Sequence, residues 1–155
     1  MPVYNLDKLM DETRRIAAEY RRSTGSTLPV SAELAKFDAI RLLGLSPASE
    51  TERAVDACLH TDGGTQKVQI KGRVIFDDKQ GQRVGQMSLD AGWDLLVLVL
   101  MDEDYLPLKI YQLSRDQLNS SIPDRGSLQK KTRGAMSVKK FKAISSLVWP
   151  ADDQR

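Results

Sequence analysis

Two neighbouring stretches of the sequence bring a carboxylate, an amide and an amine close together. Asp56 lies in a run that alternates apolar and polar residues, and Gln69 and Lys71 lie in a second such run. The turn sequence Asp62-Gly63-Gly64 between them suits a hairpin, because glycine accepts positive φ. Side chains alternate between faces along a strand, so Gln69 and Lys71 share one face. If Asp56 shares it too, three polar groups converge among apolar strands, which indicates a functional site because buried charge is costly.

One chemistry in which such a set could take part is the hydrolysis of a phosphodiester. This reaction needs an attacking water, neutralisation of the negative charge on the phosphoryl oxygens and help for the leaving group, and a divalent metal supplies most of these. Mg²⁺ prefers oxygen ligands and keeps several waters, so one or two carboxylates and the substrate phosphate are enough. We expect Asp56 to be the principal ligand and Lys71 to orient or deprotonate the water.

These residues, in this order, resemble the PD-(D/E)XK motif of the restriction-endonuclease-like nuclease superfamily, in its Gln-x-Lys variant. The run VQIKGR, followed later by WDLLVLVLMDEDYLPLKIYQLSR, is similar to a group of small prokaryotic proteins placed in that superfamily. The resemblance covers roughly Leu28 to Arg115. It implies a metal-dependent nuclease that acts on DNA, with Mg²⁺ or Mn²⁺ held by Asp56, Gln69 and Glu33. It also implies a homodimer, because two sites are needed to cut both strands.

Gln69 departs from the commoner form of the motif, which has a carboxylate at this position. The substitution removes one negative charge from the metal site and weakens metal binding unless Glu33 compensates. Glu33 lies in the first turn of a helix expected after Pro29, where a carboxylate is also stabilised by the helix dipole alone. Both roles of Glu33 stay open. The rival function is therefore a non-catalytic nucleic-acid-binding or assembly module that keeps the nuclease fold.

Three other polar features have simpler explanations. His60 is the only histidine and lies at a strand end beside the turn, where an exposed side chain without a role is the common outcome. Cys58 is the only cysteine, which excludes an internal disulfide and favours a small apolar filler. The acidic run 102–104 follows an apolar strand and is typical of a solvated turn, although a metal cluster has the same residue types.

Charge is distributed unevenly along the chain. The segment from Ser120 onward has eight Lys and Arg against three Asp, a net charge of +5, whereas residues 1–119 have 15 against 18, a net charge of −3. A basic segment suits an anionic partner such as DNA, and a solvated helix face has the same composition. The residues that we expect to contact DNA are Lys130, Lys131, Lys139, Lys140, Lys142 and Arg73.

The periodicity of apolar residues predicts an α/β (α+β) fold, a restriction-endonuclease-like domain with a four-stranded mixed sheet flanked by helices. The 155 residues, 41% hydrophobic, suit one domain with its core at about 28–118. We expect an N-terminal helix 7–22 with a solvated arginine face, a helix from 31 to Gly44 and a linker 46–49. The expected strands are 55–60, 68–73, 95–101 and 108–113, followed by a short helix 115–118. The basic segment 120–149 then contains a loop 120–133 and a closing helix 137–148.

The N-terminal residues lack an apolar signal segment. The longest apolar run, Leu95 to Met101, is too short to cross a bilayer. We therefore expect a cytoplasmic protein.

Overall fold

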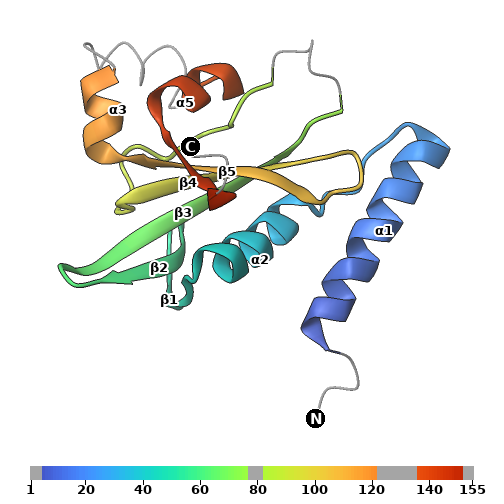
Figure 1. Ribbon diagram of the computed structural model, residues 1–155, viewed down its shortest axis with the longest axis horizontal. Coiled ribbons are helices and arrows are strands. Elements are labelled where there is room, and N and C mark those ends of the chain that lie inside the picture. Colours follow the sequence, from blue (N-terminus) through green and yellow to red (C-terminus); the bar gives the residue numbers. More distant parts are fainter. Residues whose placement is uncertain (1–4, 77–81, 122–135, 152–155) are drawn as a thin grey trace.

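A computed structural model shows helices and strands arranged around one mixed sheet (Figure 1). The structure describes residues 5–76, 82–121 and 136–151. Within these residues the elements are α1 (Leu6–Thr24), α2 (Ser31–Leu43), β1 (Ser46–Glu52), β2 (Val55–Thr61), β3 (Gly64–Val74), β4 (Leu95–Met101), β5 (Pro107–Ser114), α3 (Arg115–Ser121), α5 (Val138–Ile144) and β6 (Ser146–Trp149).

The sheet has six strands in the described residues, in the order β1-β2-β3-β4-β5-β6. Only β3 and β4 run parallel, and the other neighbours are antiparallel. The expected α+β class with a mixed sheet is confirmed, but the expectation of four strands is wrong. Both additional strands lie at the edges of the sheet, where pairing depends on one neighbour only.

Each edge strand lies where the sequence predicted a different kind of element. The expected linker 46–49 begins β1, whose Pro47 pairs with Ala57 of β2, and proline is tolerated there because an edge strand has one side without a partner. The expected closing helix ends at Ile144, and β6 follows it. Leu147 and Val148 pack on opposite faces of the sheet, which successive residues of a strand can do.

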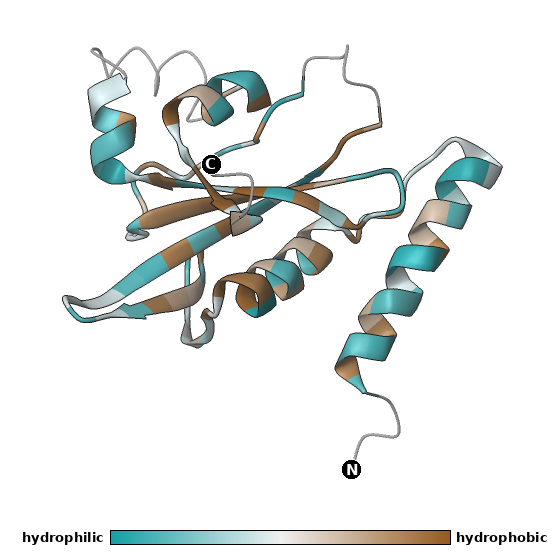
Figure 2. Ribbon diagram, viewed as in Figure 1, coloured by the Kyte–Doolittle hydropathy of each residue, from teal (hydrophilic) through white to brown (hydrophobic). Residues whose placement is uncertain are grey.

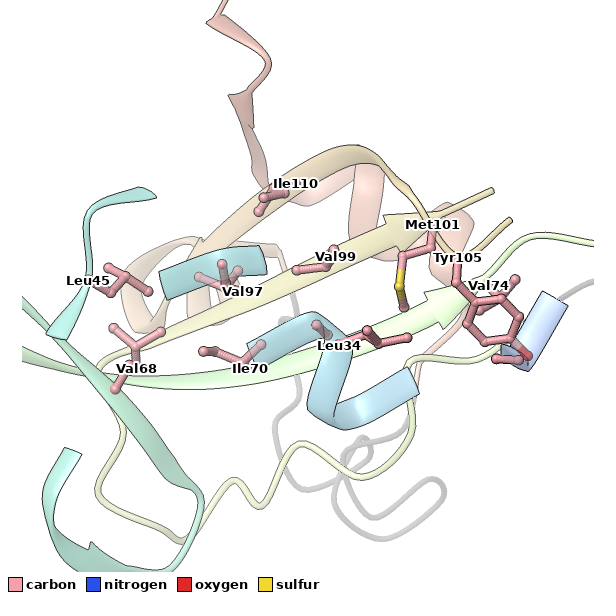
Figure 3. Packing of buried hydrophobic residues seen from close by; sticks show 14 of the residues in the cluster. Leu34, Leu45, Val68, Ile70, Val74, Val97, Val99, Met101, Tyr105 and Ile110 are labelled. Carbon is pink, nitrogen blue, oxygen red and sulfur yellow. The ribbon is translucent and has the colours of Figure 1, made fainter. Parts of the chain in front are cut away.

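Strand β4 lies at the centre of the sheet, and all seven of its residues are buried, as its uninterrupted apolar sequence predicted. Val97, Val99 and their alternate neighbours pack toward α2 (Figure 3). Leu96, Leu98 and Leu100 pack on the opposite face, with Trp93 and Phe141. The core thus consists of two layers, one on each side of the sheet.

Helix α2 lies directly on β3, and Gly72 permits this close approach. A Cβ at Gly72 would lie 2.5 Å from the Cβ of Ala35 in α2, so no larger residue fits there without a shift of the helix. Helices α3 and α5 cover the other face (Figure 1). The sheet is thus covered by α2 on one face and by α3 and α5 on the other.

Helix α1 lies to one side of the sheet and is tied to the rest of the molecule by a buried ion pair (Figure 1). The guanidinium of Arg14 binds the carboxylate of Asp38 in α2 and also donates to the carbonyl of Tyr105. Arg14 is 4% exposed, so the expected solvated arginine face of this helix is wrong at this position. Within the described residues, no helix is both long and apolar enough to cross a membrane.

Candidate functional site

The polar residues of β3 point away from α2. Gln69, Lys71 and Arg73 pair in register with Leu96, Leu98 and Leu100 of β4, whose side chains face α3 and α5. Val68, Ile70 and Val74 alternate with them and pack toward α2. This register agrees with the predicted shared face of Gln69 and Lys71.

Strands β2 and β3 separate at Asp56. Their pairing runs from Thr61 opposite Gly64 to Ala57 opposite Val68 and does not continue beyond. Instead, the Asp56 carboxylate accepts a hydrogen bond from the backbone N–H of Ile70, with Oδ2 2.8 Å from the nitrogen. Because that N–H lies in the plane of the sheet, the carboxylate lies beside β3, level with the peptide that joins Gln69 and Ile70. Its other oxygen, Oδ1, lies 3.6 Å from Nζ of Lys36 in α2, the helix from which Gln69 and Lys71 point away.

Lys36 of α2 is a site residue that the sequence analysis missed. Its Nζ lies 3.6 Å from Oδ1 of Asp56 and 3.5 Å from Oε1 of Glu33. The i,i+3 spacing of Glu33 and Lys36 on a helix was the available signal for the second contact, but the first depends on the tertiary fold. One ammonium group thus bridges the two carboxylates that we expected to bind a metal.

Glu33 itself points mainly into solvent. Its side chain is 72% exposed, whereas that of Asp56 is 21% exposed, and Lys36 lies between them. Lys36 separates Glu33 from Asp56, and the role of Glu33 as a metal ligand stays a prediction.

Lys71 is half-buried and makes no hydrogen bond or ion pair with any described residue. Burial lowers the pKa of its ammonium, the positive charge of Arg73 lowers it further, and the negative charge of Asp56 partly offsets both effects. A lowered pKa makes the lysine a weaker base that releases its proton at a lower pH than an exposed lysine does. The Lys71 amine thus has no hydrogen-bond partner among the described residues, and the Asp56 carboxylate is near enough to affect its pKa.

Gln69 has a buried oxygen without a partner. Its side chain is 3% exposed, and its Oε1 makes no hydrogen bond. A buried polar atom left without a partner costs free energy of about 1–3 kcal/mol, so it needs an explanation, and a ligand is one. Gln69 is the strongest local indication that this part of β3 is built to bind something.

The side-chain oxygens of Asp56 and Gln69 are of the type that a hard divalent cation prefers. Asp56 and Gln69 offer one carboxylate and one unpartnered amide oxygen, and Mg²⁺ binds through as few as one or two carboxylates because it keeps waters and takes substrate oxygens. Among the described residues, no group of three or more His, Cys, Asp or Glu gathers at one place. A site that encloses the metal fully in protein ligands is therefore not formed by the described residues.

Arg73 is bound to the protein itself. Its guanidinium donates to the carbonyls of Gly72, Arg83 and Val84, at 2.6, 2.6 and 2.7 Å. A Cβ at Gly85, where φ is +92°, would lie 2.6 Å from Nη2 of Arg73. Arg73 thus holds the segment after residue 82 against β3, and its contact with DNA stays a prediction.

The described part of the basic segment lies on the same face of the sheet as Lys71. Phe141 of α5 packs in that face, and Lys139, Lys140 and Lys142 of the same helix are exposed. Lys142 also lies 5.9 Å from the centre of the Tyr111 ring. Lys130 and Lys131 lie outside the described residues.

The remaining candidates lie apart from this group. His60 is exposed, and its Nδ1 lies 3.1 Å from Oγ1 of Thr65 across the hairpin. Asp102 accepts hydrogen bonds from the backbone N–H groups of Asp104 and Leu106, so it shapes the turn between β4 and β5. Asp104 forms an ion pair with Arg22. These contacts are structural and explain the acids as parts of a turn.

No protein-family model and no curated protein matches the sequence. The assignment of the site therefore depends on the residues and their geometry: a carboxylate at the edge of β3, an unpartnered amide oxygen and an amine with a lowered pKa.

Proposed function

We propose that this protein is a metal-dependent nuclease that hydrolyses phosphodiester bonds of DNA, with a restriction-endonuclease-like core and its site on β3. The observation that carries the proposal is the position of the Asp56 carboxylate, which binds the Ile70 N–H at 2.8 Å between Gln69 and Lys71. A carboxylate held by a backbone N–H is fixed in place without using its second oxygen. The second oxygen, Oδ1, lies 3.6 Å from Nζ of Lys36, so a ligand that binds it would displace Lys36.

Each residue has a defined role in this proposal. Asp56 and the unpartnered Oε1 of Gln69 would hold Mg²⁺ or Mn²⁺. The metal, when bound, lowers the pKa of a water and neutralises charge on the phosphoryl oxygens. Lys71 would accept a proton from the attacking water when its amine is neutral, or stabilise the developing negative charge when it is protonated. Glu33, at the rim, would contribute through its negative charge.

The decisive experiment is cleavage of a panel of linear, nicked, branched and single-stranded DNA with Mg²⁺ and with Mn²⁺. We expect Lys71→Ala to reduce cleavage by at least about a hundredfold, the scale for the loss of one acid–base or electrostatic group. DNA affinity should change far less, because many phosphates contribute to it. The matched control is Lys67→Ala, which removes a lysine of the same strand that pairs with Glu52 at 2.9 Å. Cleavage by Lys71→Ala equal to wild type contradicts the proposal.

The rival function is a non-catalytic nucleic-acid-binding or assembly module, and one observation favours it. Two cations, Lys36 and Lys71, act on Asp56, and Arg73 acts on Lys71, against the two acids Asp56 and Glu33. A net positive site suits a phosphate better than a metal. Wild-type protein that binds DNA but cuts no member of the panel with either metal would establish the rival.

DNA binding itself is tested by its dependence on salt. If Lys139, Lys140 and Lys142 contact phosphates, their replacement by glutamine should flatten the salt slope of DNA affinity by up to about three ion equivalents. A variant that loses the same charge elsewhere, at Arg41, Arg53 and Lys67, is the control. Equal slopes for both variants would mean that the exposed face of α5 is only solvated.

A further inference from the structure

Lys36 of α2 contacts both carboxylates of the candidate site with one ammonium group. Hydrophilic residues lie between the apolar ones along α2, so this helix packs on the sheet and still carries charges beside it (Figure 2). Nζ of Lys36 lies 3.6 Å from Oδ1 of Asp56 and 3.5 Å from Oε1 of Glu33. The other oxygen of Asp56, Oδ2, accepts the hydrogen bond from the Ile70 N–H. Lys36 therefore lies against the Asp56 oxygen that a metal would bind.

The Lys36 ammonium can leave Asp56 at little cost to the fold. The side chains of Lys36, Asp56 and Glu33 are 38, 21 and 72% exposed. Ion pairs that water reaches contribute little to stability, because solvent screens the attraction. A lysine side chain is also long and flexible, so its ammonium can turn away while α2 keeps its place on β3. A second cation that binds Oδ1 of Asp56 can therefore displace Lys36.

The position of Lys36 decides whether this part of the site attracts a phosphate. In the structure, Asp56 and Glu33 carry two negative charges, and the one positive charge of Lys36 is used to offset them. A divalent cation on Asp56 would take over this task and would repel the ammonium. Lys36 would then lie beside a metal that takes phosphate oxygens as ligands. An ammonium forms strong charge-assisted hydrogen bonds with phosphate, so the displaced Lys36 should bind there.

Lys36 differs in this respect from Lys71 of β3. Lys71 makes no hydrogen bond or ion pair with any described residue, so its charge is available to a ligand with or without a metal. The charge of Lys36 becomes available only after its contact with Asp56 is broken. Of these two lysines, Lys36 is therefore the one whose contact with a phosphate depends on the metal.

We propose that Lys36 couples the binding of metal to the binding of DNA. It neutralises Asp56 in the metal-free protein, and it binds a phosphate of DNA when a divalent cation is bound at Asp56. This inference rests on the proposed function, because it needs that cation, and it adds a regulation of the same site. Coupling of this kind is reciprocal: the metal raises the affinity for DNA, and DNA raises the affinity for the metal by the same factor.

The salt dependence of DNA affinity tests the coupling, because its slope counts the phosphates that the protein neutralises. Duplex DNA is titrated with wild type and with Lys36→Met at several salt concentrations, with Ca²⁺ or with EDTA, and electrophoresis verifies that the DNA stays uncut. We expect Ca²⁺ to steepen the slope of wild type by about one ion equivalent relative to Lys36→Met. Ca²⁺ also competes for the phosphates of DNA, and the comparison of the two proteins removes that shared effect.

Two further variants control for the lost charge. Lys36→Arg keeps a cation at this position and should keep the change in slope. Lys67→Met removes an exposed lysine that pairs with Glu52, and it should respond to Ca²⁺ as wild type does. Circular dichroism should be the same for all of these proteins. A Lys36→Met variant that responds to Ca²⁺ like wild type overturns the proposal, and so does a Lys67→Met variant that loses the response equally.

Calorimetry of Ca²⁺ binding without DNA separates a failure of the coupling from a failure of the metal site. If wild type binds no more Ca²⁺ than Asp56→Asn, the proposed function and the coupling are both overturned. If Ca²⁺ binding depends on Asp56 but the slope changes equally in wild type and Lys36→Met, the coupling alone is overturned. Ca²⁺ binding that depends on Asp56, with a change in slope that depends on Lys36, is the result that the proposal predicts.

Discussion

Two polar clusters lie inside this protein, and they differ in how fully their groups are bonded. In the first, Arg14 binds Asp38 through two nitrogens and also donates to the Tyr105 carbonyl, and Asp38 is completely buried. In the second, Asp56 has one backbone hydrogen bond and a cation at 3.6 Å, Gln69 has an oxygen without a partner, and Lys71 bonds to no described residue.

The difference separates a structural role from a functional one. A buried charge pair with its hydrogen bonds satisfied fixes the packing of the elements that carry it, here α1 on α2. A polar cluster that leaves donors and acceptors unpaired costs stability, and it is retained when a ligand completes it. The first cluster should therefore respond to mutation in stability, and the second in ligand binding and activity.

The largest expected effect on stability is at the first cluster. Asp38→Ala leaves the guanidinium of Arg14 buried without its partner, which should lower the free energy of unfolding by about 3–5 kcal/mol. Urea unfolding at neutral pH measures this. The control Glu12→Ala removes an exposed ion pair of the same helix and should have little effect. A small loss of stability in Asp38→Ala would contradict the structural role of the first cluster.

A mutation in the second cluster should change the stability of the protein in the opposite direction. Because folding lowers the pKa of Lys71 below its ordinary value of 10.5, the unfolded chain holds this proton more tightly. The buried Lys71 charge therefore lowers the free energy of unfolding by its full amount at pH values below the folded-state pKa. This loss of stability disappears as the pH rises to 10.5. Lys71→Met should therefore be more stable than wild type at neutral pH, by a margin that narrows on approaching pH 10.5, and it should lose cleavage. Urea unfolding at several pH values measures the margin; a destabilised variant would mean that the Lys71 charge is structural.

The smallest expected effect concerns Lys36. Its ammonium lies on the oxygen of Asp56 that a metal would use, so Lys36→Met should raise the affinity for Mn²⁺ in calorimetry by up to about tenfold. Lys67→Met is the control, because that lysine pairs with Glu52 instead. Weaker binding in Lys36→Met would show that Lys36 holds Asp56 in place. Glu33→Gln should weaken binding only slightly, since Glu33 is at the rim.

The sequence predicted those parts of the fold that local pattern determines. The hairpin around Asp62-Gly63-Gly64, the buried strand 95–101 and the alternation of Gln69 and Lys71 all follow from the period of apolar residues and from turn chemistry. The edge strands β1 and β6 did not follow, because their short, mixed sequences become strands only by pairing with β2 and β5.

The contacts of the site were predictable only in part. Strand alternation alone would place Asp56 on a face of the sheet, whereas the separation of β2 and β3 puts its carboxylate at the edge of β3. Lys36 and Arg14 lie on helices, where the sequence shows only that a residue is charged. Which charge is buried, and against which partner, depends on how α1 and α2 pack, and no local pattern contains that information.

The most direct test of the central claim is a crystal of the protein soaked in Mn²⁺, with anomalous scattering used to locate the ion. If the cluster of Asp56, Gln69 and Lys71 binds a metal, we expect Mn²⁺ to be bound by Asp56. The Gln69 oxygen should then turn toward the ion, and Lys36 should be displaced. A matched crystal of Asp56→Asn should show weaker density or none. No Mn²⁺ at Asp56 in crystals that bind the ion elsewhere would contradict the claim.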